Sequence, residues 1–247
     1  MKAIVLAGGY ATRLWPITKH RPKMFLPVGE STVIDTVFED LEADDRISEV
    51  YVSTNERFAD EFASYLDGSP FEKPTLSVED TTGEDEKFGV VGALAQLVDR
   101  EGIEEDLIVV AGDNLISFDV AEFVDFFEAK GTPAIAAYDV GSKERAKSYG
   151  LVDLDGDRVV DFQEKPDDPN STLVSIACYA FPRREPRRTG VVHPVDPVPP
   201  ARPRVHLRRG VVRHRDAREL PRRRRVASRR RRLRRAGYDD RELAPPG

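Results

Sequence analysis

Residues 3–9 read AIVLAGG, an apolar run that stops at two adjacent glycines. A short apolar run that feeds a glycine turn is typical of a buried parallel strand followed by a loop. No acidic residue precedes Glu30, although the chain holds 44 acidic and 38 basic residues. The cations ahead of that point are Lys2, Arg13, Lys19, Arg21 and Lys23. Such a loop suits a polyphosphate, because glycine N–H groups approach the anion closely and cations neutralise it.

Strand-like and helix-like segments alternate from this loop to residue 181. Further strands are predicted at Glu49–Ser53, Thr75–Glu79, Leu107–Ala111 and Pro133–Tyr138. Helices are predicted at Thr32–Ala43, Glu56–Leu66, Gly89–Val98 and Val120–Lys130. This alternation predicts an α/β fold, an open and mostly parallel sheet with helices on both faces. A hairpin at Leu151–Leu154 and Val159–Gln163 and a last strand at Thr172–Phe181 are predicted to follow.

The composition changes near Arg183. Residues 1–182 carry 16 basic and 37 acidic residues, a net charge of −21, whereas residues 183–247 carry 22 basic and 7 acidic residues, a net charge of +15. We therefore divide the chain into a domain at 1–182 and an Arg/Pro-rich, irregular tail at 183–247, which has too little apolar volume to order itself. The acidity of the domain suggests a salt-adapted cytoplasm, because salt screens the self-repulsion of like charges.

The tail has two interpretations. An arginine-rich arm binds nucleic acid through its phosphates. Alternatively, the tail is an out-of-frame translation of a GC-rich gene, since repeated GAC codons for aspartate become CGA codons for arginine when read one nucleotide early. All 22 cations of the tail are arginine, including Arg222–Arg225 and Arg229–Arg232. We favour the frame change and do not expect a nucleic-acid partner.

Cysteine content and hydropathy bear on the compartment. The single cysteine, Cys178, excludes an internal disulfide and favours a reducing compartment. No apolar run approaches the roughly 20 residues that a membrane-spanning helix needs. The N-terminus, MKAIVLAGGY, lacks the apolar region of a signal peptide. We expect a cytoplasmic protein with no membrane partner.

The opening stretch resembles the signature of the sugar nucleotidyltransferases, L-A-G-G-x-G-T-R-L-x-P-x-T followed by P-K and L-P. The positions that fit are Leu6, Ala7, Gly8, Gly9, Arg13, Leu14, Pro16, Thr18, Pro22, Lys23, Leu26 and Pro27. Ala11 stands where the family commonly has a third glycine. The dinucleotide motif G-x-G-x-x-G and the P-loop motif do not fit this stretch. The resemblance implies a Rossmann-like nucleotide-diphospho-sugar transferase fold, NTP and sugar 1-phosphate as substrates, and Mg²⁺ as cofactor.

The resemblance also implies roles for single residues. Nucleotide binding is expected of Leu6, Ala7, Gly8, Gly9, Glu79 and Gly89, the last two on the base side. Catalytic roles are expected of Arg13 at the departing pyrophosphate, Lys23 at the α-phosphate and Asp113 as the Mg²⁺ ligand. Binding of the sugar phosphate is expected of Asn114, Tyr149, Gly150, Glu164 and Lys165. A single carboxylate at the carboxyl end of a parallel strand suits Mg²⁺, which takes phosphate and water oxygens as its other ligands.

The resemblance ends near Phe181. The family has a second metal-binding aspartate near a W-x-D-x-G-T motif, whereas the only tryptophan of this chain is Trp15. Three functions therefore stay open. The first is a sugar-1-phosphate nucleotidyltransferase, the second a nucleotide-binding domain with a nucleic-acid-binding arm, and the third an inactive NTP-binding module. We place the transferase first and leave the base, the sugar, the activity of this chain and homo-oligomerisation open.

Overall fold

The fold is built around strand β1 (Lys2–Leu6), whose three middle residues have no exposed surface. β1 pairs in parallel with β4 (Glu49–Asn55) on one side and with β6 (Leu107–Ala111) on the other. β5 (Pro74–Glu79) pairs in parallel with the outer edge of β4. The computed structural model describes residues 1–79, 89–114, 116, 118–183 and 210–214 of the chain. The apolar run at the N-terminus is thus an inner parallel strand, as its sequence predicts.

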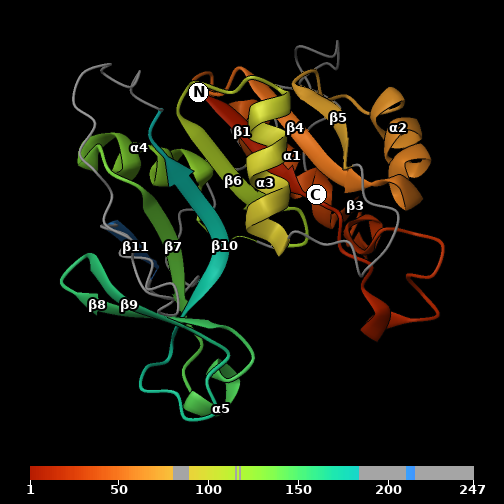
Figure 1. Ribbon diagram of the computed structural model, residues 1–247. Helices are drawn as coiled ribbons and strands as arrows, with labels where there is room; N and C mark the ends of the chain where they lie inside the picture. Colours follow the sequence, from red (N-terminus) through yellow and green to blue (C-terminus); the bar gives the residue numbers. More distant parts are fainter. Residues whose placement is uncertain (80–88, 115, 117, 184–209, 215–247) are drawn as a thin grey trace, which may run out of the picture. The chain divides into compact units, whose positions relative to one another are not determined.

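Beyond β6, the strands β10 (Leu173–Phe181) and β9 (Arg158–Glu164) run in the opposite direction. β10 pairs antiparallel with β6 and with β7 (Ala134–Asp139). β7 pairs in parallel with β11 (Gly210–His214). A hairpin of β8 (Gly150–Asp155) and β9 completes the sheet, whose order is β5-β4-β1-β6-β10-β7-β11-β9-β8 (Figure 1). Because β1, β4, β5, β6, β7 and β11 share one direction, the predicted open and mostly parallel sheet is confirmed.

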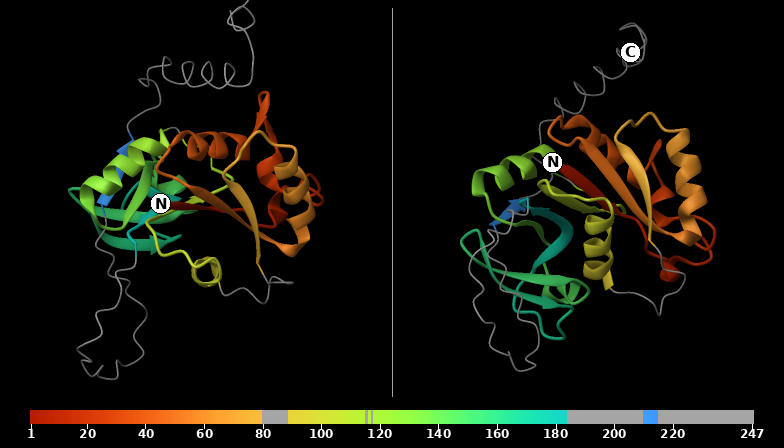
Figure 2. Two further views of the ribbon diagram at one scale, coloured as in Figure 1. Left: turned by 90° about the horizontal axis from the view of Figure 1, so that it is seen from above. Right: turned by 45° about the horizontal axis from the view of Figure 1, so that its top comes forward.

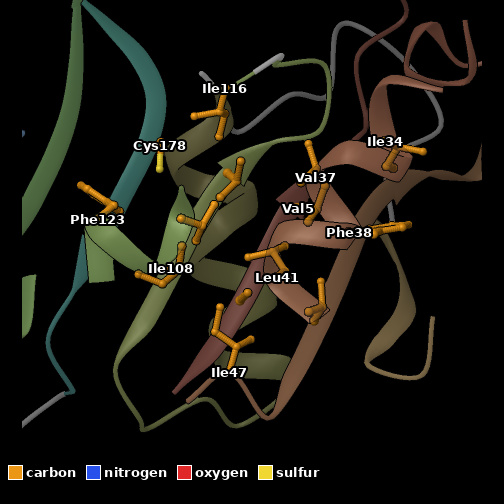
Figure 3. Packing of buried hydrophobic residues seen from close by; sticks show 14 of the residues in the cluster. Val5, Ile34, Val37, Phe38, Leu41, Ile47, Ile108, Ile116, Phe123 and Cys178 are labelled. Atoms are coloured by element: carbon orange, nitrogen blue, oxygen red, sulfur yellow. The ribbon is translucent and has the colours of Figure 1, made fainter. Parts of the chain in front are cut away.

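Helices cover both faces of the sheet (Figure 2). The face that carries Val5 packs against α1 (Val33–Ala43) and α4 (Val120–Lys130) (Figure 3). The helix α2 (Ala59–Asp67) contributes Phe62 to the same core. The opposite face, which carries Ile4, packs against α3 (Gly89–Arg100). Successive residues of a strand point to opposite faces, so one apolar strand contributes to two cores. Cys178 is buried in the first core, and burial raises the pKa of its thiol, as expected of a packing residue.

Side-chain caps fix the starts of two helices. The hydroxyl of Thr32 accepts from the N–H of Asp35, and the N–H of Thr32 donates to the Asp35 carboxylate at 2.6 Å. This capping box starts α1 one residue later than predicted. The Asp119 carboxylate accepts from the N–H of Ala121 at 3.0 Å and starts α4. Gly131, with φ of 60°, ends α4 where the sequence predicts.

Several short elements were not predicted. They are η1 (Thr12–Leu14), η2 (Lys23–Phe25), α5 (Lys143–Ala146) and the ribbon β2 (Pro27–Val28) with β3 (Ser31–Thr32). The helix predicted at Glu56–Leu66 is present as η3 (Glu56–Phe58) followed directly by α2, which ends one residue later than predicted. β11 lies in the segment predicted to be irregular. Apart from residues 183 and 210–214, the predicted tail lies outside the described residues, so the division at 182 stays a prediction. Within the described ranges, no helix is both long and apolar enough to cross a membrane.

Candidate functional site

The carboxyl ends of β1 and β6 meet at one edge of the sheet. The N–H of Gly112, which follows β6, donates to the carbonyl oxygen of Leu6, the last residue of β1, at 2.9 Å. Asp113 is the next residue and so lies beside the loop that follows β1. Lys23, on η2 in that loop, forms an ion pair through its ammonium group with the Asp113 carboxylate. The structure thus brings the predicted Lys23 and Asp113 together across 90 positions of sequence.

The Lys23–Asp113 pair is accessible to a ligand, since the side chains are 29% and 35% exposed. Asp113 uses its Oδ2 atom for the pair. No hydrogen bond to its Oδ1 atom is present in the described ranges. The described residues contain no group of three or more His, Cys, Asp or Glu side chains placed to hold a metal. One partly exposed carboxylate oxygen still fits Mg²⁺, which prefers one or two carboxylates with phosphate and water oxygens.

The Gly8–Gly9 turn offers two backbone donors. Gly9 is exposed, and a Cβ atom added to it would meet nothing within 4 Å. No acceptor for the N–H of Gly8 or of Gly9 is found among the described residues. Because successive free N–H groups attract anions, the turn suits a phosphate group. Glu79 borders it, with Oε1 3.3 Å from the position of a Cβ atom on Gly8.

The last three residues of β4 form hydrogen bonds that support this turn. The sequence did not predict a role for them. Ser53, Thr54 and Asn55 are polar but only 2%, 0% and 2% exposed. The carbonyl oxygen of Ser53 accepts from the N–H of Ala7 at 2.7 Å. The Thr54 hydroxyl donates to the carbonyl oxygen of Ala7 at 3.4 Å, and Asn55 Nδ2 donates to that of Gly8 at 2.8 Å. Their signal in the sequence is a run of three polar residues at the end of a buried strand.

Another residue that the sequence did not predict, Arg57, holds the loop farther along. Its Nη2 atom donates to the carbonyl oxygen of Lys19 at 2.6 Å. Its guanidinium carbon lies 5.7 Å from the ring centroid of Tyr10 and 6.0 Å from that of Trp15, within the range of cation–π attraction. The side chain of Arg13, predicted to face pyrophosphate, lies outside the described part of the structure. Arg57 therefore fixes the course of the segment that carries Arg13.

Ala11 shows why the family motif commonly has a glycine at this point. Its φ is 47°, in the left-handed region, and its carbonyl oxygen accepts from the hydroxyl of Thr18 at 2.9 Å. Thr18 is 1% exposed, so this hydrogen bond fixes the turn from inside. An L-residue with a Cβ atom is strained in this region by about 1–2 kcal/mol. The departure from the motif thus adds strain to the loop and leaves its charge unchanged.

Predicted sugar-side residues gather at one end of the β8–β9 hairpin. Gly150 pairs with Glu164 across the hairpin. The N–H of Lys165 donates to the carbonyl oxygen of Tyr149 at 3.1 Å. The Lys165 ammonium lies 3.1 Å from Glu164 Oε1, and both side chains are more than half exposed. The structure therefore brings these four residues together, with both a cation and a carboxylate exposed.

Two predicted residues lie between or beside these groups. The Asn114 Nδ2 group donates to the carbonyl oxygen of Ile176, at an irregularity in β10 where Ala177 has φ of 51°. Gly89 is the first residue of α3, and residues 80–88, between it and Glu79, lie outside the described ranges. In the described ranges, no hydrogen bond or ion pair joins the Lys23–Asp113 pair to the hairpin end.

The sequence is similar to those of known proteins over about three quarters of the chain. The sequence profile described as nucleotidyl transferase matches residues 2–185. A nucleotidyltransferase of low-salt glycan biosynthesis from Haloferax volcanii is 32% identical over 185 residues, which cover 73% of this chain and 49% of that protein. A mannose-1-phosphate guanylyltransferase from Mycobacterium tuberculosis is 31% identical over 183 residues, which cover 73% of this chain and 48% of that protein. The chain spans about half the length of the curated relatives it matches.

A solved structure shows the same fold. It is a Bacillus anthracis protein named as a candidate glucose-1-phosphate thymidylyltransferase and crystallised with sucrose. Its TM-score is 0.64 at 27% identity, over 74% of this chain and 71% of that chain. The profile match ends at residue 185, close to Phe181, where the resemblance in the sequence also ends.

Proposed function

Because the chain belongs to the nucleotidyl transferase family, we propose that it transfers a nucleoside monophosphate from an NTP to a sugar 1-phosphate. The observation that carries this proposal is the ion pair of Lys23 and Asp113 beside the N–H groups of Gly8 and Gly9, which have no acceptor among the described residues. An oxygen of the sugar phosphate attacks the α-phosphorus and forms a P–O bond. The bond from the α-phosphorus to its bridging oxygen breaks, and pyrophosphate leaves with the electron pair. The attacking phosphate is already ionised at neutral pH, so the reaction needs no general base.

Positioning and neutralisation of charge supply the catalysis in this proposal. The N–H groups of Gly8 and Gly9 hold phosphate oxygens at the end of β1. The ammonium of Lys23 neutralises charge that develops around the α-phosphate, and Arg13 neutralises the departing pyrophosphate. The N–H groups of Gly8 and Gly9 follow an inner strand, and Lys23 is held by its ion pair with Asp113, so these donors are in place before the reaction and stabilise charge better than water does.

Asp113 is the residue that we propose to hold Mg²⁺. Its carboxylate lies at the same edge of the sheet as the Gly8–Gly9 turn and is partly exposed. Bound Mg²⁺ would supply charge stabilisation at phosphate oxygens. Isothermal titration of an NTP into the protein, with and without EDTA, tests this assignment. We expect much weaker binding with EDTA, and equal binding in both buffers would contradict it.

Glu79 is proposed to select the base. A carboxylate only accepts hydrogen bonds, and Glu79 Oε1 is held by the hydroxyl of Ser53 at 2.7 Å. Guanine presents two adjacent donors, N1–H and N2–H₂, whereas uracil and thymine present one donor between two acceptors. We therefore infer that Glu79 favours GTP. The E79Q variant, which introduces a donor, should lower the ratio of kcat/KM for GTP over UTP, and an unchanged ratio would remove Glu79 from the base side.

The acceptor is proposed to bind at the hairpin end. Glu164 accepts from sugar hydroxyls there, and the Lys165 ammonium orients the attacking phosphate. The exposure of both side chains and their position beside Tyr149 and Gly150 support this assignment. A K165A variant should raise KM for the sugar 1-phosphate more than KM for the NTP.

Pyrophosphate release with a panel of NTPs and sugar 1-phosphates tests the function itself. In the K23A variant the rate should fall by about 10²–10³, the usual cost of one preorganised group that stabilises the transition state. K130A is a matched control, because Lys130 also pairs with an aspartate, Asp157, but on the surface of α4 and the hairpin turn. K130A should keep the wild-type rate.

The outcomes separate the transferase from the other functions. NTP binding without pyrophosphate release for every acceptor would favour a nucleotide-binding module. Salt-dependent binding of RNA or DNA that is lost on removing residues 183–247 would favour the nucleic-acid arm. A K23A variant that keeps most of its rate would remove Lys23 from the catalytic residues.

A further inference from the structure

The carbonyl group of Gly8 is fixed by a buried side chain. Asn55 Nδ2 donates to the Gly8 oxygen at 2.8 Å, and Asn55 is 2% exposed. The neighbouring carbonyl oxygen, that of Ala7, accepts from the hydroxyl of Thr54 at 3.4 Å, and Thr54 has no exposed surface. Two successive carbonyl groups of the loop thus point toward the end of β4.

This arrangement sets the direction of two N–H groups. The peptide bonds on either side of Gly8 are trans. In a planar trans peptide the carbonyl oxygen and the N–H of the next residue point in opposite directions. Holding the Gly8 oxygen against β4 therefore turns the Gly9 N–H away from β4, toward the exposed side. In the same way, holding the Ala7 oxygen against β4 turns the Gly8 N–H away from β4.

The state of Asn55 Oδ1 supports a role beyond packing. This atom is buried, and among the described residues and their contacts it has no hydrogen-bond partner. A buried acceptor without a partner is unfavourable, and an apolar side chain of similar size would avoid it. Asn55 also makes no side-chain cap to η3, although it is the residue before that helix. Within the described ranges, the Asn55 side chain makes one hydrogen bond, which it donates to the Gly8 oxygen.

We propose that Asn55 is a positioning residue that aims the Gly9 N–H at the phosphate groups of the substrate. The inference rests on the proposed function, in which the Gly8–Gly9 turn binds phosphate. Glycine permits either direction of the peptide plane, because it has no Cβ atom to restrict φ and ψ. The turn therefore needs an external hydrogen bond to hold the binding direction before the anion arrives.

The N55D variant tests this inference because it keeps the shape of the side chain and replaces the donor by an acceptor. A carboxylate facing the Gly8 oxygen repels it, so the peptide should turn over and the Gly9 N–H should donate to the introduced carboxylate. In ¹H–¹⁵N spectra the Gly9 amide signal should move downfield and become protected from solvent exchange. This measurement needs no ligand, so it decides the direction of the peptide independently of any activity.

Binding of inorganic pyrophosphate connects the peptide direction with the site. At pH 8 the N55D variant should bind pyrophosphate about 10- to 100-fold more weakly than the wild type, the effect of one lost hydrogen bond to a charged group. At pH 5.5 the ratio should shrink, because a buried carboxyl has a raised pKa and its protonated form regains a donor. The other charged groups near the turn, Glu79, Arg57, Lys23 and Asp113, are the same in both proteins, so the ratio of the two affinities reports the side chain at position 55.

Thermal melting shows whether N55D folds. If it does not, the N55A variant takes its place in the binding measurement. It should bind pyrophosphate more weakly at both pH values, with no recovery at pH 5.5, because it has no donor at either. An unchanged Gly9 signal in N55D, or wild-type affinity in N55A, would overturn the inference. A wild-type protein that binds no pyrophosphate would contradict the proposed function instead, and the Gly9 signal would still decide the role of Asn55.

Discussion

Adding one methyl group at Gly112 should disturb the sheet directly under the candidate site. A Cβ atom on Gly112 would lie 2.9 Å from Val5 Cγ1 and 3.2 Å from the carbonyl oxygen of Leu6. Carbon atoms pack best at about 3.5–4.0 Å, so the first contact is too short by about 0.6 Å or more. Val5 is fully buried, and the Leu6 oxygen is held by the N–H of Gly112 itself at 2.9 Å. Neither neighbour has room to move away.

The G112A variant should therefore lose about 2–3 kcal/mol of unfolding free energy, within the range for overpacked cores. For a domain of this size that corresponds to a fall in Tm of about 5–10 °C. Urea unfolding followed by circular dichroism measures the first quantity, and differential scanning calorimetry the second. G9A is the matched control, because a Cβ atom on Gly9 meets nothing within 4 Å. Its stability should stay within about 0.5 kcal/mol of the wild type.

A double-mutant cycle identifies the cause. The V5A substitution removes Cγ1, so G112A should cost at least about 1 kcal/mol less in the V5A background than in the wild type. If G112A lowered the unfolding free energy equally in the V5A and wild-type backgrounds, the contact with Val5 would be refuted. A G112A variant as stable as G9A would refute the packing argument as a whole.

Three further predictions concern other parts of the chain. The A11G variant should be more stable by up to about 1 kcal/mol in urea unfolding, because φ of 47° strains alanine but not glycine; equal or lower stability would show that the turn is unstrained. Hydrogen bonds from Arg46 lower the pKa of Asp44 in the folded protein. Asp44 therefore stabilises the fold above its unfolded pKa of about 3.9. This stabilisation is lost as the pH falls through the lower pKa of the folded state. The stability of wild type and D44N, measured between pH 2.5 and 7, should therefore converge below about pH 4; a constant difference would contradict this role. Finally, the gene read in another frame from the codon of Arg183 should encode an acidic segment with a Trp-x-Asp motif, and its absence from both other frames would refute the frame-change interpretation of the tail.

Strand and helix positions could be predicted from the sequence where the pattern was long and apolar. β6 and α4 have the predicted bounds, and α1 starts one residue later than predicted, because buried runs and helical stripes are local properties. α5 is four residues long, too short to show a period. β11 is not predictable from its own composition, since its pairing with β7 depends on a strand about 75 residues earlier.

The candidate site was predictable only where a motif marks it. Lys23 and Asp113 follow from the family signature, and the structure adds their contact, while their roles stay predictions. Asn55 and Arg57 lie outside every motif, and their importance depends on contacts with a loop about 40 residues earlier. Long-range contacts of polar side chains leave no periodic signal in the sequence. A run of buried polar residues at a strand end is nevertheless a usable signal in other α/β sheets.

The position of β10 has an evolutionary consequence. This antiparallel strand lies between β6, which ends at the phosphate side, and β7, and it also pairs with β8 of the hairpin through Val174 and Leu151. The residues proposed to bind phosphate therefore lie on one side of β10 in the sheet, and the hairpin residues proposed to bind the acceptor lie on the other, while Asn114, at the end of β6, donates to β10 itself. Substitutions at the hairpin end would leave the hydrogen bonds of the Gly8–Gly9 turn to β4 unchanged. If the proposed roles hold, a sheet divided in this way would let the acceptor change in evolution while the phosphate-binding turn stays the same.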